Sequence, residues 1–174
     1  MTYELRQATE ADLDGARGVM LDTFYREFSY GYQPQWHADA IDPRAAYLVP
    51  ARHALFVAVL GDEVVGTTGV RAQAPKSPPH PEWIARRYPE GTTAQLFRVY
   101  VRPEHRRFGL ARSLVRLATE FVAATAGYER LYLRTDARVP GVEKFWGSVA
   151  VAIHDARDGD PERFQTIHYE IPLS

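Results

Sequence analysis

The stretch from residue 94 to 127 constrains the fold more than any other part of the sequence. Its first residues, up to Val101, alternate and are rich in β-branched and aromatic types, which is typical of a half-buried strand. From Leu110 onward, apolar residues recur at helical spacing as far as Gly127. Pro103 ends the strand. The sequence therefore predicts a strand, a short loop and a long amphipathic helix in direct succession.

The loop between this strand and this helix has the features of an anion-binding site. The first N–H groups of a helix have no partner within it, and the helix dipole adds positive charge there. Gly109 lets a ligand approach the backbone closely, and Arg106, Arg107 and Arg112 add charge around it. The alternative is a simple turn with solvated arginines. Three cations at a helix start are unfavourable without an anion, so a phosphate site is favoured.

Residues 106–111 have the sequence Arg-Arg-Phe-Gly-Leu-Ala, which resembles the Gln/Arg-x-x-Gly-x-Gly/Ala motif of the GCN5-related N-acetyltransferase (GNAT) family. Val101 and Pro103 before it and Leu114 after it also match the pattern of that family. The resemblance covers essentially the whole chain in element order. It is motif-specific from about Leu96 to Ala118.

The remaining periodicities predict the order of the elements. Strands are expected at 3–8, 53–60, 64–74, 94–101, 130–135, 149–155 and 164–171, and helices at 13–28, 110–126 and 141–148. One or two short helices are expected between 35 and 48, and one helical turn at 83–88. Thr9 and Asp12 resemble a capping box at the first helix. This order predicts a mixed sheet with helices on both faces. It agrees with the α/β (α+β by some schemes), mostly antiparallel acyltransferase fold that the resemblance implies.

Composition limits the classes of function. A chain of 174 residues is about one domain, so residues 1–174 are expected to form a single N-acetyltransferase domain. No apolar signal core or membrane-spanning run is present, which predicts a cytoplasmic protein. The absence of cysteine excludes disulfides and a thioacyl-enzyme, and the six histidines lack paired ligand spacing, so no metal is expected. A net charge of −1 argues against nucleic-acid binding.

The resemblance implies transfer of an acetyl group from acetyl-CoA directly to a primary amine of a small molecule. The pantetheine of the cofactor would pair with the backbone of Val99, Tyr100 and Val101, and the Val101 N–H would donate to the oxyanion. The remaining residues expected at the cofactor are Arg106, Arg107, Phe108, Gly109, Leu110, Ala111, Arg112 and Trp146. Trp146 stands where the family often has a tyrosine that acts as general acid, and an indole N–H cannot take that role. Its alternative role is core packing.

The general base is not obvious. Where many relatives have a carboxylate on the central strand, this chain has Gln95 and Arg98, which cannot accept a proton at neutral pH. The candidate bases are Asp136, Glu82 and Glu27, with His80 and Glu90 as further titratable groups on the expected acceptor side. Each of them could instead be a solvated surface charge, and a chain of water molecules could take the proton.

The aromatic-rich segment 24–36 predicts the acceptor site, with Tyr30, Tyr32 and Trp36 together with Arg98 on the central strand. Phe24 and Phe28 lie on the apolar stripe of the first helix and are expected in the core. Two alternatives stay open: a CoA-binding module without turnover, and an acetyltransferase of peptide or protein N-termini. A homodimer is also left open, and no membrane partner is expected.

Overall fold

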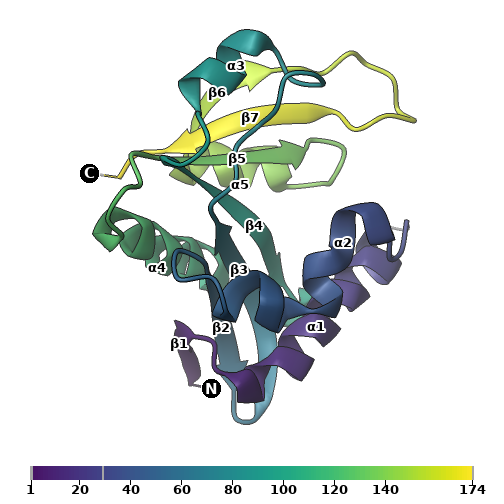
Figure 1. Ribbon diagram of the computed structural model, residues 1–174. Helices are drawn as coiled ribbons and strands as arrows, with labels where there is room; N and C mark the ends of the chain where they lie inside the picture. The colour runs from purple at the N-terminus through teal and green to yellow at the C-terminus, as the bar shows by residue number, and fades with distance from the viewer. Residues whose placement is uncertain (1, 29, 174) are drawn as a thin grey trace. The chain divides into compact units, whose positions relative to one another are not determined.

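The computed structural model describes residues 2–28 and 30–173. The chain forms two compact units, the first consisting of Met1–Arg71 with Leu96–Phe121 and the second of Ala72–Gln95 with Val122–Ser174. Strand β4 (Thr93–Val101) and helix α4 (Leu110–Ala124) each have residues in both units. Figure 1 follows the chain through these elements.

The first unit contains the N-terminal strands and helices and the loop after β4. Its other elements are β1 (Tyr3–Gln7), η1 (Glu10–Asp12), α1 (Leu13–Asp22), the π-helix η2 (Thr23–Glu27), α2 (Pro34–Ile41), η3 (Arg44–Leu48), β2 (Ala54–Leu60), β3 (Glu63–Arg71) and η4 (Pro103–His105). β1 pairs antiparallel with β2, and β2 forms an antiparallel hairpin with β3. Of these elements, β1 contacts the segment after β4 through Tyr3, and η2 contacts it through Glu27.

The beginning of η1, which leads directly into α1, is fixed by the capping residues that the sequence indicates. The Asp12 carboxylate accepts a hydrogen bond from the Thr9 N–H at 2.8 Å. The guanidinium of Arg6, on β1, donates to both oxygens of Asp12 at 2.5 and 3.0 Å, and this lowers the pKa of Asp12. The apolar stripe that follows, including Ala16 and Phe24, belongs to the buried core of this unit.

The second unit contains β5 (Arg130–Asp136), β6 (Val151–Asp155), β7 (Thr166–Ile171), α3 (Glu82–Arg87) and α5 (Val142–Val149). The start of β4 pairs with β5 in parallel, while β5 and β6 both pair antiparallel with β7. Tyr132 of β5 is fully buried beside Ile84 and Tyr88 from the α3 segment. This apolar contact attaches the segment between β3 and β4 to the strands of the second unit.

The strand order is β1-β2-β3-β4-β5-β7-β6, and β4 with β5 is a parallel pair among antiparallel ones. The mixed, mostly antiparallel sheet predicted from the sequence is confirmed. The assignment of residues 1–174 to one domain stays a prediction. Among the residues that the structure describes, no helix has the length and apolarity needed to cross a membrane.

Several predicted details are wrong. The alternation of β4 is broken at Arg98, whose φ of 54° is left-handed, so the side chains of Leu96–Val101 do not simply alternate between faces. β2 begins after His53, because the His53 N–H donates to the Pro50 carbonyl at 3.1 Å in a turn instead of joining the strand ladder. β3 ends at Arg71, and β7 begins at Thr166 because Gln165 is bonded into the preceding loop.

Candidate functional site

The loop between β4 and α4 has the backbone that the glycine argument requires. Gly109 adopts φ 74°, which glycine enters without strain, and Arg107 has the same φ at a steric cost. A Cβ built on Gly109 would meet no atom within 4 Å. There is therefore open space in front of the Gly109 backbone, immediately before the first residue of α4.

The loop is held at both ends while its middle is exposed. Leu110 is buried, and the Gly109 carbonyl accepts from the Ser113 N–H at 3.0 Å as α4 begins. On the other side, the ring of His105 is hydrogen-bonded to the Tyr3 hydroxyl at 2.9 Å. Residues 106–109 are exposed between these attachments, and Phe108 is 55% exposed. The loop thus presents its backbone and its arginines outward.

Arg106 connects this loop to β4 and to η2. Its Nε donates to the Val101 carbonyl at 3.0 Å, and its Nη2 forms an ion pair with the Glu27 carboxylate. Val101 itself is buried at the end of β4, and Val99 and Tyr100 before it are half-buried. One guanidinium therefore bridges the predicted cofactor strand and one of the candidate bases.

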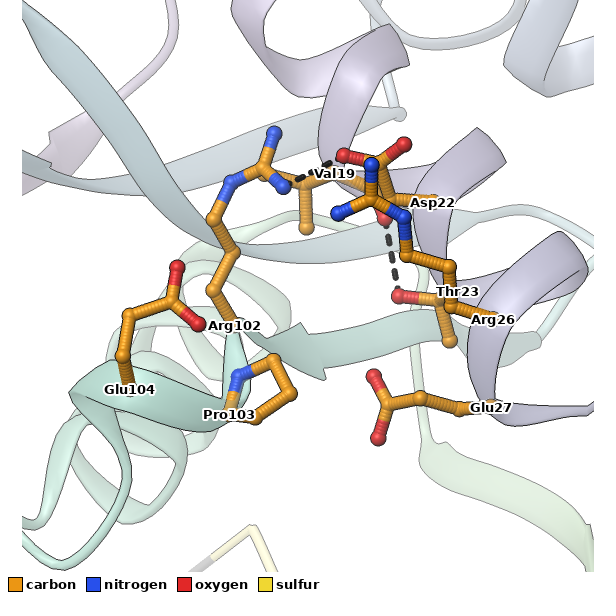
Figure 2. Close-up of a pocket in the computed structure, with 8 residues that line it drawn as sticks. All are labelled: Val19, Asp22, Thr23, Arg26, Glu27, Arg102, Pro103 and Glu104. Atoms are coloured by element: carbon orange, nitrogen blue, oxygen red, sulfur yellow. Dashed lines mark hydrogen bonds and ion pairs between the residues drawn. The ribbon is translucent and has the colours of Figure 1, made fainter.

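A small cavity of about 80 Å³ lies beside this bridge (Figure 2). Its charged lining residues are Asp22, Arg26, Glu27, Arg102 and Glu104. Arg102 is hydrogen-bonded to Asp22, with 2.5 Å between Nη1 and Oδ2. The side chain of Glu27 extends from η2 toward Pro103. The cavity therefore offers a carboxylate at its edge with space in front of it.

Arg98, predicted to bind the acceptor, is bound within the first unit. Its Nε and Nη2 donate to Asp39 at 3.0 and 2.8 Å, and Nη2 also donates to the Trp36 carbonyl at 2.8 Å. Burial of Asp39 acts to raise its carboxyl pKa, but the hydrogen bonds and charge of Arg98 outweigh it and hold the pKa below its usual value. Asp39 accepts a further bond from the Tyr47 hydroxyl at 2.6 Å. Arg98 thus attaches α2 to β4.

The predicted acceptor segment is organised around His37, which the sequence argument did not single out. The imidazole stacks on Phe24 with 3.9 Å between ring centroids, and Tyr30 lies at 5.5 Å. Its Nδ1 accepts from the Gln33 N–H at 2.8 Å, so the neutral ring carries its proton on Nε2. Burial, with the charge of Arg98, lowers the pKa of His37 to about 4. The signal available was a histidine one residue after an aromatic run.

The three predicted acceptor residues lie at different depths. Tyr30 packs on the core, Tyr32 is half-buried with its ring 6.2 Å from that of His37, and Trp36 is 56% exposed. Phe24 is fully buried, as the sequence indicates. Trp36 is therefore the most exposed of the three, while Tyr30 and Tyr32 are each half-buried.

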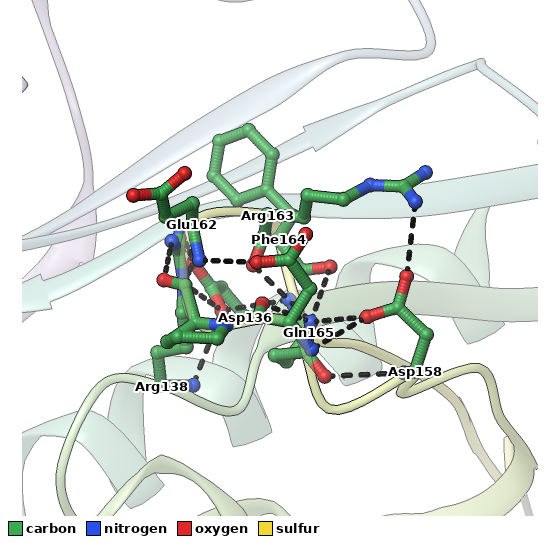
Figure 3. Close-up of polar contacts among 9 residues, drawn as sticks. Asp136, Arg138, Asp158, Glu162, Arg163, Phe164 and Gln165 are labelled. Carbon is green, nitrogen blue, oxygen red and sulfur yellow. Dashed lines mark hydrogen bonds and ion pairs between the residues drawn. The ribbon is translucent and has the colours of Figure 1, made fainter.

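Asp136, a candidate base, anchors a loop of the second unit (Figure 3). Its carboxylate accepts from the Arg138 side chain and backbone and from the Gln165 N–H at 3.1 Å. Burial alone would raise the pKa of Asp136, but these hydrogen bonds, led by Arg138, lower it. A carboxylate held ionised in this way is a poor proton acceptor.

The other predicted residues of the second unit have structural or surface positions. Glu82 is exposed at the start of α3, with Arg86 at 3.8 Å, and Glu90 is exposed as well. Trp146 is buried and packs near Tyr169, at 6.4 Å between ring centroids. This is the core role that the sequence left as its alternative, and a role beside the cofactor stays a prediction.

Further polar groups of the second unit gather around β7. The Tyr132 hydroxyl is hydrogen-bonded to His168 Nδ1 at 2.6 Å, and the rings of His80 and His154 lie 5.0 and 5.6 Å from that of His168. Burial lowers the pKa of His168 to about 4. Within residues 2–28 and 30–173, no three His, Cys, Asp or Glu side chains are arranged to hold a metal ion.

The model of the Acetyltransferase (GNAT) family matches residues 19–147. The chain belongs to this family, and the resemblance noted in its sequence is confirmed.

Solved structures share the fold at low sequence identity. A GNAT-family acetyltransferase from Staphylococcus aureus Mu50 has a TM-score of 0.74 at 13% identity, with 99% of this chain and 100% of that chain covered. YncA from Salmonella typhimurium, solved with its cofactor acetyl-CoA, has a TM-score of 0.70 at 14% identity and coverages of 100% and 95%. PaiA N-acetyltransferase from Thermoplasma acidophilum, in complex with coenzyme A, has a TM-score of 0.66 at 14% identity and coverages of 98% and 99%. No curated protein matches the sequence significantly.

Proposed function

We propose that this protein transfers an acetyl group from acetyl-CoA to a primary amine of a small molecule. The observation that carries the proposal is the open space before Gly109, at the start of α4 and beside Arg106 and Arg107. Backbone N–H groups at a helix start and guanidinium groups both bind phosphate oxygens. These residues fit the pyrophosphate of coenzyme A.

The residues of the chain would then have distinct tasks. Residues 106–112 hold the phosphates, and the backbone of Val99 to Val101 aligns the pantetheine. Bound acetyl-CoA would supply the acetyl group as a reactive thioester. The Val101 N–H is the proposed donor to negative charge that develops on the acyl oxygen. Tyr32 and Trp36 would hold the acceptor.

A second function is favoured by two specific observations. Asp136 is locked in hydrogen bonds to Arg138, and Trp146 is buried where a tyrosine acid would be expected. Both would suit a module that binds coenzyme A without turnover. Titration of acetyl-CoA, together with a thiol-release assay over amines and peptide N-termini, separates the functions. Binding with thiol release that depends on a small amine supports transfer, and binding without release supports the module.

Replacing Gly109 with valine should weaken coenzyme A binding by about 100-fold, equivalent to roughly 2.7 kcal/mol. A β-branched residue is strained at φ 74°, and its methyl groups would fill the space proposed for the phosphate. Gly61→Val is a matched control, since Gly61 has φ 62° and open space around its Cβ, but lies in the β2–β3 hairpin. Calorimetric titration of both folded variants measures the effect. Equal affinities for the two variants would contradict the phosphate site.

Replacing Tyr32 with alanine should raise the KM for the acceptor about fivefold and leave the coenzyme A dissociation constant unchanged. The half-buried Tyr32 ring is within reach of a ligand, and aromatic faces attract cationic groups. Tyr25→Ala is the control, because Tyr25 is an equally aromatic residue, 62% exposed on η2. Steady-state kinetics with the best amine test this. A change confined to coenzyme A affinity would refute the placement.

A further inference from the structure

Arg106 forms two contacts that compete with the role proposed for it in binding coenzyme A. Its Nε donates a hydrogen bond to the Val101 carbonyl, and its Nη2 forms an ion pair with the Glu27 carboxylate. Val101 is on the strand segment that is to align the pantetheine, and Arg106 is the first residue of the phosphate-binding stretch. A phosphate that takes Nε and Nη2, the two donors used in these contacts, therefore displaces both Val101 and Glu27.

A phosphate is the stronger partner. The Arg106–Glu27 pair is partly solvated, with 47% of the arginine side chain and 25% of the glutamate side chain exposed. Breaking such a pair changes an equilibrium constant by at most about fivefold. A pyrophosphate carries more charge than one carboxylate, matches the guanidinium fork, and is also held by the N–H groups at the start of α4.

Release of Arg106 would leave the Glu27 carboxylate at the edge of the cavity in Figure 2. Of the two arginines in that lining, Arg102 is already bonded to Asp22 at 2.5 Å, while Arg26 precedes Glu27 on η2. A volume of about 80 Å³ can hold several water molecules or a small ammonium group. A carboxylate beside such a space recognises a protonated amine.

We propose that Arg106 is a cofactor-responsive latch: its contacts with Val101 and Glu27 hold the Glu27 carboxylate until coenzyme A phosphate takes the guanidinium, and Glu27 then receives the ammonium group of the acceptor. This rests on the proposed function, and it assigns Glu27 as the group that binds the acceptor amine. Because both contacts belong to one guanidinium, Glu27 lies next to the Val101 end of β4.

The latch makes cofactor and amine binding mutually dependent. The change that coenzyme A produces in amine affinity must equal the change that the amine produces in coenzyme A affinity. An exposed ion pair limits the effect to about two- to fivefold in either direction. Weakening the pair from the Glu27 side should therefore strengthen coenzyme A binding, although Glu27 contacts no phosphate.

A double-mutant cycle tests the latch by calorimetric titration with coenzyme A. Glu27→Gln should tighten binding about two- to fivefold in the native background, and by less than 1.5-fold in an Arg106→Met background. Arg106→Lys is the second variant, because lysine keeps the charge but cannot span Val101 and Glu27 together. Glu10→Gln, which breaks the exposed pair with Arg44, is the matched control and should leave coenzyme A affinity unchanged.

A titration with n-butylamine, followed by NMR chemical shifts, measures the other half of the latch. Saturating coenzyme A should tighten butylamine binding to the native protein by the same two- to fivefold factor. It should leave butylamine binding to Glu27→Gln unchanged. If Glu27→Gln acts equally in both Arg106 backgrounds, or if Glu10→Gln has the same effect, the latch is wrong. If the native protein binds no coenzyme A at all, the proposed function itself is wrong.

Discussion

Replacing Arg98 with methionine should lower the free energy of unfolding by about 3 to 5 kcal/mol, the usual cost of breaking a buried ion pair from one side. Asp39 would keep its charge with only the Tyr47 hydroxyl bonded to it at 2.6 Å, and it is 4% exposed. The contact of the Arg98 guanidinium with the Phe24 ring, at 5.3 Å, would also be lost. Urea unfolding at pH 7 measures the difference.

Two further variants make this prediction specific. Adding Asp39→Asn to Arg98→Met should restore part of the stability, because the unpaired charge is then removed. Arg44→Met breaks the exposed pair with Glu10 and should leave the free energy of unfolding almost unchanged. A loss below 1 kcal/mol for Arg98→Met, or no gain from Asp39→Asn, would show that Asp39 is not held by Arg98 as the contacts indicate.

The part of the molecule that sequence predicts well is the part set by local chemistry. The start of α4 after Gly109 is predicted by apolar periodicity, which depends on residues within one or two turns of each other. The Thr9–Asp12 capping arrangement is local as well, and it is present. The phosphate loop could be proposed from the sequence for the same reason.

The interior partners of the candidate site could not be predicted in this way. Asp39 and Arg98 are 59 residues apart, and no local pattern joins them. The left-handed backbone of Arg98 is uncommon for a residue with a Cβ, so a strand pattern gives no sign of it. Likewise, Glu27 and Arg106 form their ion pair although they are 79 residues apart in the sequence. The sequence alone therefore leaves Glu27 as one candidate base among several.

His37 and His168 should make the protein sensitive to acid well above the pKa of its carboxyl groups. Burial lowers the pKa of each to about 4, whereas an unfolded histidine titrates near 6.5. The charged groups that face His37 are Arg98 and the Asp39 carboxylate. His168 is faced by Arg134 and by three rings. These are Tyr132, His80 and His154.

The sign of the pH dependence follows from the lowered pKa values. Above pH 6.5 neither state binds the protons, so the stability is complete. Between pH 6.5 and about 4 the unfolded chain binds protons that the folded chain does not, and each histidine costs about 1.4 kcal/mol per pH unit. Half-buried His53 and His80, whose pKa values burial also lowers, act in the same direction.

Lowering the pH from 6.5 to 4 should therefore remove about 5 kcal/mol of stability through His37 and His168, which is comparable to the whole stability of a marginally stable domain. The carboxylates with lowered pKa values, such as Asp12, contribute only at lower pH, so the window from pH 6 to 5 isolates the histidines. Urea unfolding across that window should show a shallower slope in His37→Phe, and NMR titration should place both native imidazole pKa values below 5. An unchanged slope in His37→Phe, or imidazole titration near pH 6.5, would show that burial does not keep these rings neutral.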